Sequence, residues 1–167
     1  MSGLVRTGLG WDSHRFVAGR PLILGGVAFP EAELGLDGHS DADVLTHAIM
    51  DALLGAAGLG DIGVLFPDTD GAYEGADSVK LLGQVLTAVA AAGWRVVNVD
   101  TTVLMERPQV GPFRDAIRLR LAQALGIEAE AVNVKASTGE GMGFVGRLEG
   151  AAALAVVTVE ALAVARD

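Results

Sequence analysis

Cysteine is absent from this sequence of 167 residues. Its absence excludes disulfide bonds, thiolate metal sites and a thiol nucleophile. A metal ion would therefore have to bind nitrogen and oxygen ligands. The lack of thiols also fits a reducing compartment, so we expect a cytoplasmic protein.

Basic residues are scarce, because 12 Lys and Arg face 21 Asp and Glu and leave a formal net charge of -9. An acidic chain without a basic cluster repels nucleic acid at long range, so we expect no nucleic-acid partner. The sequence also has no basic and apolar leader segment and no uncharged apolar run of about 18 residues. These absences predict a soluble protein that does not bind a membrane.

Aromatic residues make up only 5% of the chain, although 51% of its residues are hydrophobic. Such a composition, rich in Ala, Val and Leu, suits helices packed tightly on a sheet or a buried subunit interface. We therefore expect an oligomer. The length predicts one domain, residues 1–167.

Hydrophobic periodicity predicts a mixed sheet covered by helices. Strands are expected at 5–16, 94–105, 132–136 and 150–162, with a hairpin over 21–30. Helices are expected from near Ser40 to Gly55–Gly60, over 77–92 and over 112–125. This order predicts a single α/β (α+β) domain with helices packed on one face of the sheet.

Two local features refine this expectation. Gly8 and Gly10 lie in the first strand and predict a close approach of another backbone. Ser40, with Asp43 three positions later, resembles a capping box at the start of the first helix.

The chain has only three histidines, and their spacing suits metal chemistry. Asp12 and His14 share one face of the first strand, because residues i and i+2 point to the same side. His47 lies on the first helix, and Asp51 follows one turn later. A histidine that binds a metal usually donates a hydrogen bond to a carboxylate through its other ring nitrogen. These residues predict a zinc site of Asp12, His14 and His47, with one position open for substrate. The alternative is a surface His47 paired with Asp43 or Asp51.

His39 precedes the expected helix cap, where backbone N–H groups favour an anion such as phosphate. The alternative is a loop histidine without a function.

The segment from Gly60 to Asp70 has no helical or strand periodicity, yet it holds three carboxylates and two glycines. A functional loop would explain this pattern, with carboxylates that accept hydrogen bonds from a polyol. Ordinary turn chemistry around Pro67 and Asp68 is the alternative.

The segment from Lys135 to Arg147 leaves a strand and enters a run of small, hydroxylated and glycine residues. Its backbone N–H groups, with Ser137 and Thr138, could surround phosphate oxygens. Glu140 suits such a site only if a divalent cation such as Mg²⁺ lies between it and the phosphates. A flexible surface turn is the alternative.

Four ordered motifs together resemble the 2-C-methyl-D-erythritol 2,4-cyclodiphosphate synthase family. They are Gly8 to Phe16, His39 to His47, Asp61 to Gly63 with Phe66 to Asp70, and Asn133 to Ala136 with Glu140. The resemblance implies a homotrimer whose sheets meet around the trimer axis, with active sites at the subunit interfaces. It also implies conversion of 4-diphosphocytidyl-2-C-methyl-D-erythritol 2-phosphate into the cyclic diphosphate and CMP, a step of non-mevalonate isoprenoid synthesis.

The resemblance assigns roles to individual residues. It makes Asp12, His14 and His47 the ligands of one Zn²⁺ per subunit, and Glu140 a ligand of Mg²⁺ or Mn²⁺. It makes His39 and Thr138 stabilisers of the transition state. The methylerythritol part would be held by Ser40 and the loop residues Asp61, Ile62, Gly63, Phe66, Pro67, Asp68, Thr69 and Asp70.

The same resemblance places the cytidine diphosphate on a neighbouring subunit. The residues implied are Met105, Glu106, Arg107, Pro108, Gln109, Val110 and Gly111, with Ala136, Ser137, Thr138, Gly139 and Glu140. Gln109 stands where some members have lysine, and Gly139 precedes Glu140 where a threonine is expected. Phe144, Arg147 and Glu149 match residues that line a central trimer cavity able to hold an isoprenoid diphosphate.

Two other functions use the same features. A zinc phosphodiesterase or phosphatase would have the same metal ligands and use water as the nucleophile. A non-catalytic trimeric protein that binds isoprenoid diphosphates would need only the small apolar residues of the last strand.

Overall fold

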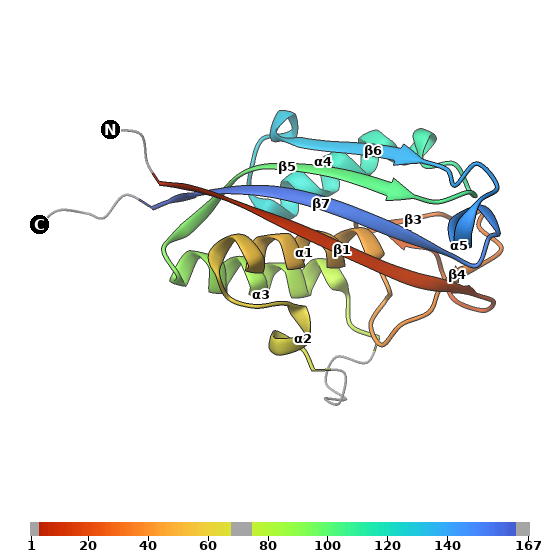
Figure 1. Cartoon of the computed structure of the whole chain (residues 1–167), viewed down its shortest axis with the longest axis horizontal. Coiled ribbons are helices and arrows are strands. Elements are labelled where there is room, and N and C mark those ends of the chain that lie inside the picture. The colour runs from red at the N-terminus through yellow and green to blue at the C-terminus, as the bar shows by residue number, and fades with distance from the viewer. Residues whose placement is uncertain (1–3, 68–74, 163–167) are drawn as a thin grey trace, which may run out of the picture.

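A five-stranded mixed sheet forms the centre of the computed structural model, which describes residues 4–67 and 75–162 (Figure 1). Its strands lie in the order β4-β1-β7-β5-β6. Their bounds are β1 Val5–Val17, β4 Gly35–Leu36, β5 Trp94–Leu104, β6 Val132–Ser137 and β7 Gly150–Ala161. Only β5 and β6 run parallel, while the other neighbours are antiparallel. The predicted mixed α/β fold is confirmed.

The helices pack against this sheet and against one another. They are α1 Val44–Ala57, α2 Ile62–Leu65, α3 Ser78–Ala91, α4 Arg114–Leu125 and α5 Gly143–Gly146, with 3-10 turns η2 Gly111–Phe113 and η3 Ala129–Ala131. Helix α1 lies on β1 and β7, α3 lies beside α1, and α4 lies along β6. The predicted hairpin is β2 Ile23–Leu24 and β3 Val27–Ala28. No helix within these ranges is both long enough and apolar enough to cross a membrane.

Helix α1 is the most buried helix of the described chain, because it lies between the sheet and α3. Leu45, Ile49 and Leu53 are fully buried, and so is most of the rest of the helix. A helix with neighbours on most sides is apolar around most of its circumference. Gly58, in a left-handed conformation, ends it, as the glycines at this point predicted.

The glycines of β1 let the backbone of α1 lie directly on the strand. A Cβ atom on Gly8 would lie 1.9 Å from the carbonyl oxygen of Ala52, and one on Gly10 would lie 1.8 Å from that of Ala48. The close approach predicted from these glycines is therefore confirmed. Asp12 and His14 continue the same face of the strand, so they come close to α1 as well.

The start of α1 differs from the prediction. The helix begins at Val44, and its N-cap is Asp43 and not Ser40. The carboxylate of Asp43 is fully buried and accepts hydrogen bonds from the backbone N–H groups of Gly25, Gly26 and Thr46 at 2.7–3.0 Å, and from the Thr46 hydroxyl at 2.8 Å. Burial raises its pKa, although these hydrogen bonds oppose that shift. Asp43 thus joins the β2–β3 turn to the helix, a contact that local sequence could not predict.

The face of the sheet that points away from α1 carries exposed apolar side chains. On β1, Leu9 is 68% and Trp11 52% exposed. They lie opposite Val156 and Leu154 of β7. Apolar side chains gathered on one sheet face are typical of an interface.

Candidate metal centre and active site

Three ligand atoms from β1 and α1 meet at one point. The Nε2 atom of His14 lies 2.9 Å from Asp12 Oδ2 and 3.1 Å from His47 Nδ1. His47 Nδ1 lies 3.0 Å from the same Asp12 oxygen. The other Asp12 oxygen accepts a hydrogen bond from the Ser13 backbone N–H at 2.8 Å, which orients the carboxylate.

The orientation of His14 fits metal binding. Its Nδ1 atom lies 2.6 Å from the carbonyl oxygen of Asp37, which can only accept, so Nδ1 carries the hydrogen. In the neutral ring the lone pair is then on Nε2 and points at the triangle. Gly38 leaves room for this contact, because a Cβ atom there would lie 2.9 Å from Cε1 of the ring.

The triangle has nearly the dimensions of a zinc site. Tetrahedral zinc with ligand distances of about 2.0–2.1 Å separates its ligand atoms by about 3.3–3.4 Å. The observed separations of 2.9–3.1 Å are only slightly shorter. Two imidazole nitrogens and one carboxylate oxygen, without any thiolate, are a common donor set for zinc with an open fourth position. The residues present therefore fit the ion.

The charges at the site are strongly coupled. Burial alone would raise the pKa of Asp12, but hydrogen bonds with His14 and His47 outweigh it and hold the pKa well below the usual value of 3.8. Burial alone would lower the pKa of His14, but the hydrogen bond and charge of Asp12 raise it above 6.5. Without a metal, the site thus favours a proton shared with a carboxylate.

We expect opposite pH dependences for the zinc-free fold and for zinc binding. Because the folded pKa of His14 is raised, its protonated form stabilises the zinc-free fold below the unfolded pKa. That contribution is lost as pH rises through the folded pKa. Zinc needs the neutral imidazole, so zinc affinity rises over the same range. Thermal unfolding of chelator-treated protein and zinc titrations between about pH 6 and 9 test this.

The matched control for this experiment is Asp12→Asn, which removes the carboxylate that raises the His14 pKa. The difference between the two proteins isolates this site from other titrating groups. A zinc-free wild type whose stability, relative to Asp12→Asn, increases from pH 6 to 9 would contradict the expectation.

Asp51 does not have the role that the sequence indicated. Its carboxylate accepts a hydrogen bond from the Ile62 backbone N–H at 2.8 Å, so it holds the start of α2. The Nε2 atom of His47 instead lies 2.9 Å from Ser78 Oγ and 3.1 Å from Ser40 Oγ. Sequence reasoning missed Ser78, which lies 31 residues from His47 and has no local pattern that marks it.

A cavity of about 310 Å³ opens beside the ligand triangle. Of the predicted substrate residues, it is lined by His39, Ser40, Ile62, Gly63 and Phe66. Sequence reasoning did not identify Gly38, Met50 and Leu81, which also line it. Asp61 caps α2 by accepting a hydrogen bond from Val64 N, and Pro67 is exposed. Asp68, Thr69 and Asp70 lie outside the described residues.

His39 does not lie at the N-terminus of α1, because that helix begins five residues later, at Val44. The expected phosphate site at that helix end is therefore wrong, although His39 does face the cavity. Arg20 holds the segment around His39 by donating hydrogen bonds to the carbonyl oxygens of Gly38, at 2.5 Å, and Ser40. Sequence reasoning missed this role of Arg20.

The predicted nucleotide residues form a second group at the ends of β5 and β6. The backbone N–H of Met105 donates to the Ser137 carbonyl at 3.0 Å, and that of Gly139 donates to Glu106 Oε2 at 2.9 Å. The exposed Thr138 hydroxyl donates to Glu140 Oε1 at 3.2 Å. Glu106, Arg107, Pro108 and Gln109 line a cavity of about 540 Å³. Within the described ranges, none of the residues of this group lines the cavity beside the ligand triangle.

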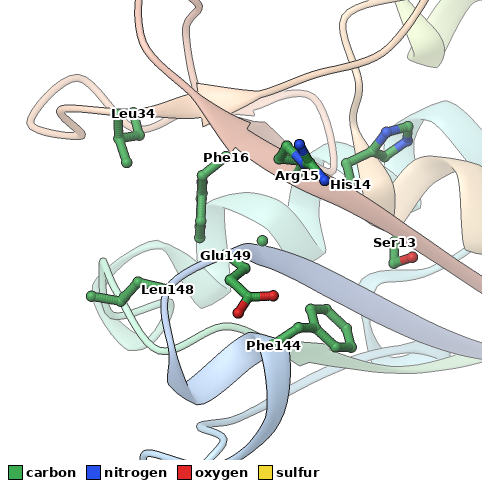
Figure 2. Close-up of a pocket in the computed structure, with 9 residues that line it drawn as sticks. Ser13, His14, Arg15, Phe16, Leu34, Phe144, Leu148 and Glu149 are labelled. Carbon is green, nitrogen blue, oxygen red and sulfur yellow. The ribbon is translucent and has the colours of Figure 1, made fainter.

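A further cavity of about 510 Å³ lies between the end of β1 and the turn around α5 (Figure 2). Phe144 and Glu149 line it, and the ring of His14 points away from them in Figure 2. Arg147 donates to Glu149 Oε1 at 2.7 Å and is itself exposed. His14 lines both this cavity and the one beside the ligand triangle.

Comparison with known proteins identifies the family. The YgbB family model matches residues 5–160, nearly the whole chain. The chain belongs to the YgbB family. This YgbB-family chain is 57% identical over 152 residues to the 2-C-methyl-D-erythritol 2,4-cyclodiphosphate synthase of Symbiobacterium thermophilum, across 91% of this chain and 96% of that protein. The resemblance inferred from the four motifs is confirmed.

Solved structures of related proteins have the same fold. The YgbB-family chain superposes on a 2C-methyl-D-erythritol-2,4-cyclodiphosphate synthase in a CDP-bound form with a TM-score of 0.85 and 37% identity, over 93% of this chain and 100% of that one. It superposes on the bifunctional IspDF from Campylobacter jejuni with a TM-score of 0.92 and 43% identity, over 96% of the YgbB-family chain. It spans 43% of that longer protein.

Proposed function

We propose that this protein converts 4-diphosphocytidyl-2-C-methyl-D-erythritol 2-phosphate into 2-C-methyl-D-erythritol 2,4-cyclodiphosphate and CMP. The observation that carries the proposal is the triangle of Asp12, His14 and His47 atoms, 2.9–3.1 Å apart, beside a cavity. The 57% identity to a synthase of this name supports the choice of reaction.

The reaction is an intramolecular displacement at phosphorus. An oxygen of the 2-phosphate forms a bond to the β-phosphorus, the bond from that phosphorus to the bridging oxygen breaks, and CMP leaves with this oxygen. Such a displacement needs little covalent help from the protein, so positioning and charge neutralisation supply most of the acceleration. Bound zinc would supply a Lewis acid that polarises the β-phosphate.

The residues around the cavity position the substrate in this proposal. His39 and Ser40 lie on the wall beside the ligand triangle, where an imidazole and a hydroxyl can donate hydrogen bonds to phosphate oxygens. Asp61, Ile62 and Gly63 hold the methylerythritol part at the start of α2, which Asp51 anchors.

We also propose a homotrimer in which two subunits complete each site. In one subunit β1 and β6 are three strand positions apart, which is about 14 Å. Thr138 and Glu140 follow β6 and line none of the cavity beside the triangle. A second copy can bring its own Thr138 and Glu140 to the zinc centre. The exposed Leu9 and Trp11 on the open sheet face support packing of the sheets around a common axis.

In this assembly Glu140 would bind Mg²⁺ or Mn²⁺ between the phosphates of the cytidine diphosphate. We expect Glu140→Gln to raise the Mg²⁺ concentration for half-maximal turnover by about tenfold, because a neutral amide is a weaker ligand for a hard cation. Initial rates at a series of Mg²⁺ concentrations measure this. Glu130→Gln, an exposed glutamate in η3, is the matched control and should leave the curve unchanged. An unaltered curve for Glu140→Gln would contradict its role.

Incubation with the diphosphocytidyl substrate tests the function as a whole. We expect release of CMP that stops when a chelator removes the metals. Phosphorus NMR should show a cyclic diphosphate, whereas a zinc phosphodiesterase or phosphatase would give a linear product. Protein that holds no zinc and releases no CMP would favour the non-catalytic binding protein.

Several predictions from the sequence belong to this proposal. We propose one domain over residues 1–167, a location in the cytoplasm, and no nucleic-acid or membrane partner. The assignment of Phe144, Arg147 and Glu149 to a central cavity for an isoprenoid diphosphate stays a prediction as well. Phe144 and Glu149 line the cavity in Figure 2. That cavity lies at the end of β1, the strand whose exposed apolar face would point to the trimer axis.

A further inference from the structure

A series of hydrogen bonds runs outward from His47 on the side of its ring that faces away from the ligand triangle. The Nε2 atom of His47 lies 2.9 Å from the hydroxyl oxygen of Ser78, the first residue of α3. The Ser78 hydroxyl in turn contacts Asp41 Oδ1. Ser78 is fully buried and His47 nearly so, so water does not compete for the contact between them.

The hydrogen bonds of Asp41 decide which group donates and which accepts in this series. One carboxylate oxygen accepts the Ser78 backbone N–H at 3.0 Å, and the other accepts the Asp43 backbone N–H at 3.2 Å. An ionised carboxylate can only accept, so the Ser78 hydroxyl donates its hydrogen to Asp41. The oxygen of Ser78 therefore presents a lone pair to His47.

This direction selects one tautomer of His47. Facing an acceptor, Nε2 must carry a hydrogen, which leaves the Nδ1 lone pair as the one that can bind zinc when the ion takes the place of the hydrogen shared with Asp12. Nδ1 is the atom that lies 3.1 Å from His14 Nε2 and 3.0 Å from Asp12 Oδ2. Together with the Asp37 carbonyl on His14, the hydrogen bonds outside the triangle point two imidazole lone pairs at a single position.

The backbone between Asp41 and Asp43 makes this arrangement possible. Ala42, fully buried, has a left-handed conformation with φ of 57°. Asp41 contacts the start of α3, while Asp43 caps α1 and holds the β2–β3 turn. A conformation that is unfavourable for alanine is tolerated where the surroundings enforce it.

We infer that Asp41 and Ser78 are a positioning pair that holds His47 in its metal-binding tautomer. This inference rests on the proposed zinc site and adds two residues that do not touch the ion. Removal of the pair leaves Ser40 Oγ, 3.1 Å from Nε2, as the remaining polar neighbour of that atom among the described residues. The Ser40 hydroxyl can rotate and donate to Nε2, which stabilises the tautomer that cannot bind zinc through Nδ1.

Two variants test the pair in different ways. Ser78→Ala removes the hydroxyl, whereas Asp41→Ala leaves the hydroxyl free to reverse and donate to His47. We expect each to weaken zinc binding about tenfold, as loss of a hydrogen-bond partner of a ligand histidine commonly does. Competition with a chromophoric chelator measures the affinity. Thr87→Ala on the same helix is the matched control, because its exposed hydroxyl donates to the Gly83 carbonyl at 2.9 Å and lies away from His47.

The tautomer itself is observable. In zinc-free Asp12→Ala protein under alkaline conditions, where no Asp12 carboxylate faces Nδ1, ¹⁵N NMR distinguishes the protonated from the unprotonated ring nitrogen of His47. We expect the hydrogen on Nε2 in this background alone and with Thr87→Ala, and a shift of population towards Nδ1 when either test substitution is added. These spectra need only the folded chain, so each variant that folds gives a result independently of turnover.

The outcomes separate this inference from the proposed function. If the wild type binds no zinc, the proposed function fails. If it binds zinc, but both variants bind with wild-type affinity, the positioning role alone is wrong. A His47 that carries its hydrogen on Nδ1 in the Asp12→Ala background would also overturn the role.

Discussion

His47→Ala should reduce the bound zinc to well below one ion per chain. The substitution removes one of three ligand atoms that lie 2.9–3.1 Å apart. Loss of a mere hydrogen-bond partner of a ligand costs about 10- to 100-fold in affinity, so loss of the ligand itself should exceed about 100-fold. Metal analysis of the protein after gel filtration measures the zinc content. Release of CMP should fall with it.

His39→Ala is the matched control, since it removes the histidine that lines the same cavity without joining the triangle. It should keep its zinc and lose turnover. Unchanged zinc in His47→Ala would contradict the ligand assignment. Loss of zinc in His39→Ala would instead indicate that any histidine substitution disturbs the cavity.

Gly10→Ala should destabilise the protein by several kcal/mol, on the order of 4–5. The new Cβ atom would lie 1.8 Å from the Ala48 carbonyl oxygen and 2.8 Å from the Ala52 nitrogen. Both are backbone atoms of α1, so no side chain can rotate away and the helix must move off the strand. Such a loss is comparable with the entire stability of many domains, about 5–15 kcal/mol.

Chemical denaturation measures this effect, with Gly55→Ala as the matched control. Gly55 lies in α1 itself, and a Cβ atom there meets nothing within 4 Å. Alanine has the higher helix propensity by about 1 kcal/mol, so this variant should be slightly more stable than the wild type. A Gly10→Ala protein as stable as the wild type would show that the contact between β1 and α1 can relax.

The long elements and the ligand triad could be read from sequence because their signals are local. Alternation marked β1, and helical spacing marked α3 and α4, within one or two residues of their observed bounds. Asp12 and His14 are two positions apart on a strand, so their common direction follows from strand geometry alone. The glycines of β1 likewise predicted the close approach of another backbone, which is that of α1.

The short elements α2 and β4 were missed because tertiary contacts, and not periodicity, stabilise them. Helix α2 has four residues and begins where Asp51 accepts the Ile62 N–H, and β4 has two residues paired with the end of β1. Neither is long enough to show a hydrophobic period. The cap of α1 was misplaced for a related reason, since Asp43 is selected over Ser40 by donors from the β2–β3 turn.

The sequence by itself determined the fold class, the long elements, the family and the three residues of the ligand triangle, because spacing along the chain encodes each of them. Only the tertiary structure decided how the histidines are held. The Asp37 carbonyl lies 23 residues from His14, and Ser78 lies 31 residues from His47. Hydrogen bonds across such separations depend on how α1, α3 and β1 pack, and no local pattern specifies that packing.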